Sequence, residues 1–156
     1  MKITLLLAEF AKADQQGEVT AVGMGWNSRP TPLPPFALVI FVEVGWDETN
    51  KPHVLTCDLV TEDGEPVELS GPLGDQPVHF EARVEAGRPP GAVHGTAFRA
   101  PLAINVGGPV PLPPGRYEWR AAINGFPQAT AVAPFVATGR RQSRPPQPES
   151  PQEADQ

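Results

Sequence analysis

The longest apolar run in the chain extends from Phe36 to Val44 and contains one polar residue, Glu43. At the two-residue spacing of a strand, both faces of this run are apolar, one with Phe36, Leu38, Ile40, Val42 and Val44, the other with Ala37, Val39 and Phe41. This pattern predicts a central strand that is covered on both sides. A buried helix is the alternative for a short apolar run, but the Pro-rich entry and the Gly-Trp-Asp exit favour a strand.

Shorter segments with alternating or apolar character predict the remaining strands, at 2–11, 18–26, 53–62, 67–69, 77–86, 96–106, 116–124 and 129–138. The clearest alternation is in 77–86, where apolar residues alternate with His79, Glu81, Arg83 and Glu85. One face of that strand is therefore expected to be wet, as in antiparallel sheets. Pro101 lies within 96–106, which predicts an edge strand or an interruption there.

The polar turn at 14–17 predicts that the segments 2–11 and 18–26 form an opening hairpin. Gly23 and Gly25 fall on one face of the second segment, which indicates a bulge or the close approach of another backbone.

The strand pattern, with no convincing amphipathic helix, predicts an all-β fold: an antiparallel β-sandwich of the immunoglobulin-like, Greek-key type with eight or nine strands. The 21 prolines and 15 glycines among 156 residues agree with many short strands and turns. We expect one domain at 1–138. The segment 139–156 is rich in Pro, Gln and Glu and has almost nothing to bury, so it is expected to be a disordered tail.

The stretch Pro113-Pro114-Gly115-Arg116-Tyr117 precedes the penultimate predicted strand. It is similar to the turn and tyrosine corner of immunoglobulin-like domains. We expect Gly115 to adopt a positive φ. Tyr117 should be buried with its hydroxyl bonded to the preceding turn, and Trp119 should lie in the core.

Charge and hydropathy exclude some partners. The net charge is −6 and the body of the chain has no basic run, so a nucleic-acid surface is not expected. No apolar stretch reaches the length of a membrane span. The segment 3–8 imitates a signal peptide but is too short, so we expect a first strand and a cytoplasmic protein. A single cysteine, Cys57, excludes an intramolecular disulfide and is compatible with a reducing compartment.

Few residues have the pattern of a reactive site. Cys57 is on the inward side of its predicted strand, which favours a buried structural thiol. His53, His79 and His94 do not have metal-ligand spacing. Acidic loops at 47–48 and 62–65 could offer oxygen ligands to calcium, but turn-forming and solubilising roles explain them. We therefore expect no catalytic residues, no metal and no cofactor.

Two functional hypotheses from different classes follow. The favoured one is a non-catalytic module that binds a protein partner or assembles with itself through strand edges or the Pro-rich loops 32–35 and 111–114. The alternative is a small-ligand or carbohydrate-binding sandwich, with a weak hydrolase activity at most. Its candidate residues are Trp26, Trp46, Asp47, Glu48, His53 and His94. An aromatic platform beside converging carboxylates would favour the alternative, and scattered, buried tryptophans would oppose it.

Five segments carry a resemblance to a known family: Leu-Leu-Leu-Ala, Gly-Met-Gly-Trp, Pro-Phe-Ala-Leu, Trp-Asp-Glu-Thr-Asn-Lys-Pro-His and Leu-Pro-Pro-Gly-Arg-Tyr. Over about residues 3–136 the chain resembles a family of small bacterial, largely actinobacterial β-sandwich proteins of unknown function. The resemblance implies a compact domain found as a short protein. It identifies no catalytic residues and no ligand.

Overall fold

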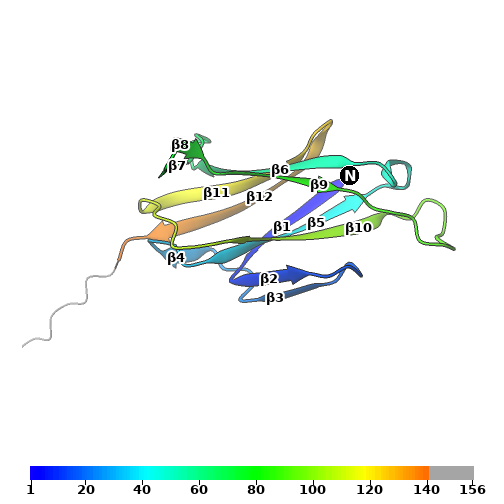
Figure 1. Ribbon diagram of the computed structural model, residues 1–156, viewed down its shortest axis with the longest axis horizontal. Coiled ribbons are helices and arrows are strands. Elements are labelled where there is room, and N and C mark those ends of the chain that lie inside the picture. Colours follow the sequence, from blue (N-terminus) through cyan, green and yellow to red (C-terminus); the bar gives the residue numbers. More distant parts are fainter. Residues whose placement is uncertain (141–156) are drawn as a thin grey trace, which may run out of the picture.

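A computed structural model describes residues 1–140 and consists of β-strands with one short 3-10 helix, η1 (Trp46–Glu48) (Figure 1). The strands are, in chain order, β1 (Lys2–Ala8), β2 (Phe10–Ala13), β3 (Val19–Val22), β4 (Ser28–Pro30), β5 (Phe36–Val44), β6 (His53–Thr61), β7 (Glu68–Gly71), β8 (Gly74–Pro77), β9 (His79–Val84), β10 (Phe98–Val106), β11 (Gly115–Ile123) and β12 (Phe126–Thr138). The predicted all-β class is confirmed.

Strand β5 is central and is covered on both faces, as its apolar pattern predicts. It pairs antiparallel with β1 on one side and with β10 on the other. On its inner face Leu38, Ile40 and Val42 have no exposed surface. On its outer face Ala37 and Val39 are also fully buried, because the β2–β3 hairpin packs over them. Both faces therefore contribute to the burial of apolar surface.

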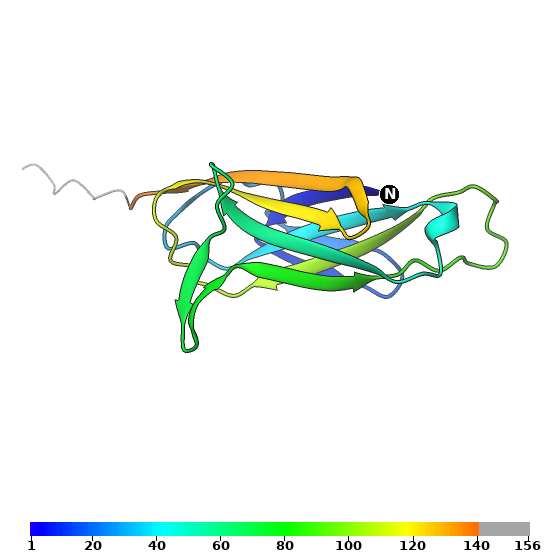
Figure 2. The same cartoon turned by 90° about the horizontal axis from the view of Figure 1, so that it is seen from above.

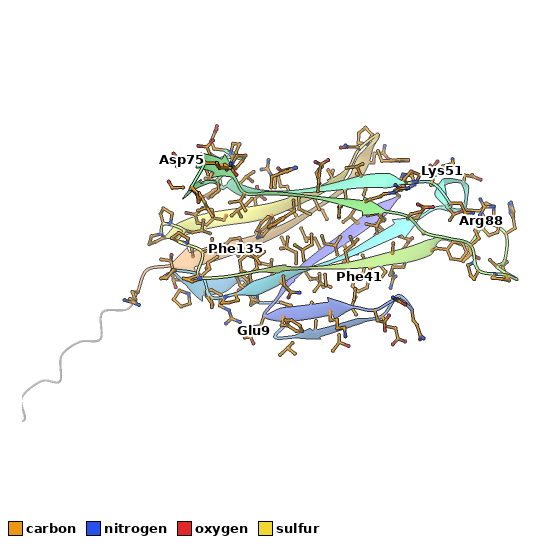
Figure 3. The ribbon with its side chains drawn as sticks, in the orientation of Figure 1. Glu9, Phe41, Lys51, Asp75, Arg88 and Phe135 are labelled. Atoms are coloured by element: carbon orange, nitrogen blue, oxygen red, sulfur yellow. The ribbon has the colours of Figure 1, made fainter. Side chains whose placement is uncertain are left out.

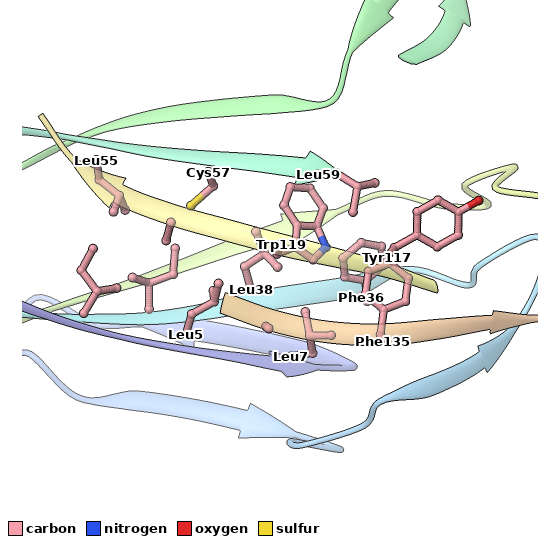
Figure 4. Close-up of a cluster of buried hydrophobic side chains, with 14 of the residues drawn as sticks. Leu5, Leu7, Phe36, Leu38, Leu55, Cys57, Leu59, Tyr117, Trp119 and Phe135 are labelled. Atoms are coloured by element: carbon pink, nitrogen blue, oxygen red, sulfur yellow. The ribbon is translucent and has the colours of Figure 1, made fainter. Parts of the chain in front are cut away.

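Two larger sheets face each other around one core. The first has the order β1-β5-β10 and the second has the order β4-β12-β11-β6-β9. Their facing side chains meet in a cluster that includes Leu38, Leu55, Trp119 and Phe135 (Figure 4). The parallel pairing of β4 with β12 makes the second sheet mixed.

Two hairpins stand apart from these sheets. The β2–β3 hairpin lies below the three-stranded sheet in Figure 1 and forms a small second core with β5. Its attachment includes the Asn105 side chain of β10, which accepts a hydrogen bond from the Ala11 N–H and donates one to the Ala11 carbonyl oxygen. The β7–β8 hairpin projects at the opposite edge, and most of its residues are exposed.

The predicted count of eight or nine antiparallel strands is wrong, because residues 1–140 form twelve strands and one pairing is parallel. The predicted strand 2–11 divides at Glu9, whose N–H donates to the Val22 carbonyl and turns the chain into the hairpin. The predicted strand 18–26 ends at Val22, because Gly23 and Gly25 adopt positive φ. Strand β4 and the first three residues of β8 lie outside the predicted strands.

The closing corner agrees with two of its three predictions. Tyr117 is buried, and its hydroxyl donates to the Pro113 carbonyl oxygen at 2.7 Å. Trp119 has no exposed surface and stacks on Phe80. The positive φ predicted for Gly115 is wrong, because β11 already begins there and Gly115 pairs as extended backbone with Ala137.

The predicted domain boundary at Thr138 coincides with the end of β12. Gly139 and Arg140 are exposed, and the rest of the predicted tail, 141–156, lies outside the described residues. Within residues 1–140 the structure contains no helix with the length and apolar character needed to span a membrane.

The core assignment of the closing corner gives a first prediction. Trp119→Ala is expected to lower the free energy of unfolding by about 3–5 kcal/mol, because the whole ring is buried. Trp119→Phe should cost clearly less, because it keeps most of the apolar volume and removes an indole N–H that lacks a partner among the described residues. Tyr117→Phe should cost about 1 kcal/mol, because the carbonyl of exposed Pro113 can bond to water.

Urea titrations of the three variants measure these differences. A wild-type midpoint for Trp119→Ala would contradict the placement of this ring in the core.

Candidate functional site

The six residues proposed from the sequence separate to opposite ends of the fold. Strand β5 runs from Phe36, which contacts Trp26, to Val44, which precedes η1. Five of the six lie at the η1 end: Trp46, Asp47, Glu48, His53 and His94. Trp26 lies at the other end, next to Phe135. In Figure 3, Arg88 and Lys51 mark the η1 end, and Phe135 lies toward the other.

At the η1 end, Trp46 is the centre of a cluster. The Arg88 guanidinium lies 4.2 Å from the centre of the Trp46 ring and donates to the Trp46 carbonyl and to the Thr49 hydroxyl. The ring of His94 is 4.8 Å away, and the ring of Phe98 is 6.2 Å away. Arg88 therefore ties the 85–97 connection to η1, and the guanidinium already covers one face of the indole.

The other candidates at this end have structural contacts. His53 is buried, its Nε2 lies 2.8 Å from the Glu48 carbonyl oxygen, and its ring packs edge-on against Phe126. The Glu48 carboxylate is 3.6 Å from the Lys51 ammonium. Asp47 is exposed. The structure thus brings His94 to Trp46, whereas His53 is used to hold the start of β6 against η1.

At the far end Trp26 is fixed by several contacts. Its indole N–H donates to the Ala8 carbonyl at 3.0 Å, and its ring packs edge-on against Phe36 and Phe135. An adjacent pocket of about 400 Å³ is lined by Glu9, Trp26, Arg29, Pro30, Pro34, Pro35 and Phe36. The Arg29 guanidinium donates to Glu9 at 2.8 Å and also lies over the Trp26 ring. The two polar groups of this pocket are therefore paired with each other.

Cys57 lies in the core, as its position in the alternation predicts. Burial, with a smaller contribution from the neighbouring Asp58 carboxylate, raises the pKa of the thiol to about 12. A thiol with this pKa carries almost no thiolate near neutral pH, so Cys57 is unsuited to nucleophilic attack. Within residues 1–140, no group of three or more His, Cys, Asp or Glu side chains is arranged to hold a metal ion.

The two long sides of the fold differ in how well they close. On one side β1 and β12 are in contact, and their inward side chains, such as Leu5 and Phe135, are buried. On the other side β9 and β10 form no ladder within the described residues. Six inward side chains on this side are only half-buried: Val78, which precedes β9, Phe80 and Ala82 of β9, and Ala100, Leu102 and Ile104 of β10. Val84, at the end of β9, is buried. We call these six residues and the two strand edges beside them the open flank. Figure 2 shows the ribbons of the two strands, β9 in green and β10 in yellow-green.

The backbone of β9 presents unpaired groups along this flank. The Leu59 N–H of β6 donates to the Val78 carbonyl, so the even-numbered residues that follow also bond toward β6. Because the hydrogen bonds of an antiparallel strand alternate in direction, His79, Glu81 and Arg83 direct their N–H and C=O groups away from β6. Those groups have no backbone partner among the described residues.

The same reasoning applies to β10. The Leu7 carbonyl accepts from the Gly25 N–H, so the odd-numbered residues of β1 bond away from β5. In the observed registers, β5 therefore bonds to β10 through its even-numbered residues, such as Ile40, opposite Leu102. The nitrogen of Pro101, which carries no hydrogen, therefore faces the free edge, where no ladder hydrogen bond is lost. This confirms the prediction of an edge strand, and β10 continues through Pro101 without interruption.

The wet face of β9 carries charges of both signs. His79 Nδ1 lies 2.6 Å from the Asp58 carboxylate, and Arg83 lies 3.3 Å from Glu85. The hydrogen bond with Asp58 is the main cause that raises the pKa of His79 above its ordinary 6.5. Charged side chains on an edge strand limit uncontrolled pairing with other chains. The β9 edge is thus accessible to another strand, but its charges restrict which strands can pair with it.

Sequence reasoning missed Arg88 and Phe98 in the Trp46 cluster, and of the two free strand edges it predicted that of β10, from Pro101, but not that of β9. No local signal identifies Arg88, because its partners, Trp46 and Thr49, are distant in sequence. The free edge of β9 did have a signal, the charged alternation of 77–86, but the order of strands in the sheets was needed to interpret it.

A second prediction concerns Cys57. Maleimide labelling of the native thiol near pH 8 is expected to be about a thousandfold slower than labelling in denaturant, because the pKa is raised from 9.0 to about 12. The rate is measured by mass spectrometry. Equal rates in the two states would contradict the burial of the thiol.

A third prediction concerns His79. Its pKa is raised in the folded state, so its stabilising contribution is complete below about pH 6.5 and is lost as the pH rises through the folded-state pKa. Proton NMR titration should place the pKa of His79 above 6.5, and Asp58→Asn should lower it. An unchanged pKa in the Asp58→Asn variant would show that the observed hydrogen bond does not control this titration.

The comparison with family models supports the sequence resemblance in one respect, a family of unknown function that covers most of the chain. The comparison with curated proteins gives no match. The family model described as "Family of unknown function (DUF6941)" matches residues 3–134, which include every strand from β2 to β11 and most of β1 and β12. Because this match extends over most of the chain, the protein belongs to the DUF6941 family of unknown function.

Proposed function

We propose that the protein is a non-catalytic binding module whose open flank takes a protein partner by strand addition. The observation that carries this proposal is the half-burial of apolar side chains between two unpaired strand edges, β9 and β10. A partner strand would supply hydrogen bonds to the free backbone groups and cover side chains such as Phe80 and Leu102. Main-chain bonds give affinity in this binding mode, and side-chain pockets give specificity.

The other sheet edges are partly bonded or covered by neighbouring segments. The Leu7 carbonyl on the outer side of β1 already accepts from the Gly25 N–H at 2.6 Å. The edge of β12 is partly covered by β4, which pairs with residues 136–138. Asn105 of β10 is bonded to β2 through its side chain. Within the described residues, the β9 edge directs the backbone groups of His79, Glu81 and Arg83 outward without a backbone partner.

The immunoglobulin-like, Greek-key description is part of this proposal. The strand order β1-β5-β10 opposite β12-β11-β6-β9 corresponds to the A-B-E and G-F-C-C′ arrangement of such domains. The corner at Tyr117, on the penultimate strand, supports the same description. In this scheme β9 has the place of C′, an added edge strand, so its exposure follows from the topology.

The small-ligand or carbohydrate-binding alternative has weaker support. Trp26 and Trp46 lie at opposite ends and Trp119 is in the core, so no two tryptophans share a platform. Arg88 covers one face of Trp46, and the Trp26 N–H is bonded to Ala8. These positions oppose the aromatic platform that sugar binding would use.

Site-specific photocrosslinking tests the proposal and gives a fourth prediction. A photoreactive phenylalanine replaces Glu81 on the free edge of β9 in the full chain, expressed in its native host. The matched control carries the same group at Thr130, an exposed position on β12. We expect a crosslinked protein product from position 81 and a much weaker one from position 130.

The product is identified by mass spectrometry, and either another protein or another copy of the chain supports the proposal. No product from position 81, or equal products from both positions, would contradict it.

A further inference from the structure

We infer that the partner of the β9 edge is a second copy of this chain, joined by antiparallel β9–β9′ pairing centred on Ala82. This inference rests on the proposed function and specifies its partner. It follows from three features of the strand: the direction of its free backbone groups, the order of its charges and the apolar character of its inner face.

The backbone permits this register. Two antiparallel strands form hydrogen-bonded pairs only where both opposed residues direct their backbone groups to the shared edge. On β9 these are the odd-numbered residues, such as Glu81 and Arg83. Centring the pair on Ala82 places Glu81 opposite Arg83 of the second copy, so both members of the pair are odd-numbered and the bonds can form.

The charges select this register from its neighbours. With Ala82 at the centre, Glu81 faces Arg83′ and His79 faces Glu85′, and symmetry repeats each pair. Centring on Glu81 would place Glu81 opposite itself and His79 opposite Arg83′. Opposite charges across a strand pair are favourable and like charges are unfavourable. Centring on Phe80 would place Arg83 opposite Pro77, which has no N–H to donate.

The inner face also benefits. With Ala82 at the centre, half-buried Phe80 lies opposite Val84′, and Ala82 lies opposite Ala82′. Directly opposed residues share one face of a sheet. The two five-stranded sheets would thus form one continuous sheet with an unbroken apolar inner face. The same two-fold axis places β10 of each copy on that inner side, where the remaining half-buried side chains of the open flank lie.

Sedimentation of the full chain tests the inference and is the fifth prediction. We expect a reversible dimer with twice the 16.7 kDa chain mass. Glu81→Arg and Arg83→Glu should each weaken the dimer at least about tenfold, because each places like charges opposite one another at two positions. An equimolar mixture of the two variants should recover dimerisation, because every pair of positions 81 and 83′ then joins an arginine to a glutamate. The double variant E81R/R83E should recover it as well.

Glu62→Arg and Arg116→Glu serve as matched controls, because these residues form an exposed ion pair away from β9. They change the net charge by the same amounts and should leave the dimer constant unchanged. Circular dichroism verifies that every variant is folded.

Three outcomes would overturn the inference: a single-chain mass at all concentrations, a dimer unaffected by both β9 reversals, or no recovery in the mixture. Crosslinking at position 81 separates the two proposals. A different protein captured there would leave the proposed function standing while self-pairing fails.

Discussion

The fold depends on the need to cover β5 on both faces. Its inner residues, such as Leu38 and Ile40, pack against the second sheet, and its outer residues Ala37 and Val39 pack under the β2–β3 hairpin. A strand that is apolar on both faces is destabilised wherever either face meets water. The β2–β3 hairpin and the five-stranded sheet therefore have the same role, because each buries one apolar face of β5.

In this arrangement, the two long sides of the fold differ in how completely their apolar side chains are buried. Buried side chains close the β1–β12 side, whereas on the other side β9 and β10 form no ladder with each other within residues 1–140. Burial of the half-buried apolar side chains on this side by a partner would be favourable. The charged side chains on the solvent-exposed face of β9 would give this binding its specificity. Strand exposure and charge order together link the architecture to the proposed binding function.

The sequence predicted the features that local pattern controls: the central strand 36–44, the wet face of 77–86, the buried Tyr117 and the edge position implied by Pro101. It did not predict β4 or β8, because their pairing depends on strands that are distant in sequence or on turns without an apolar signal. The candidate residues were only partly brought together. Trp46 contacts His94 because the 85–97 connection, which contains no strand, folds back onto η1. Trp26 is separated from both residues by the length of β5.

The accessibility of the β9 edge is measured most directly by amide hydrogen exchange, resolved residue by residue by NMR, over a range of protein concentrations. In dilute protein, the N–H groups of His79, Glu81 and Arg83 should exchange rapidly while those of Phe80 and Ala82 remain protected. As the concentration rises, the first three should become protected. Protection of all five amides in dilute protein, or rapid exchange of the first three at every concentration, would contradict the account.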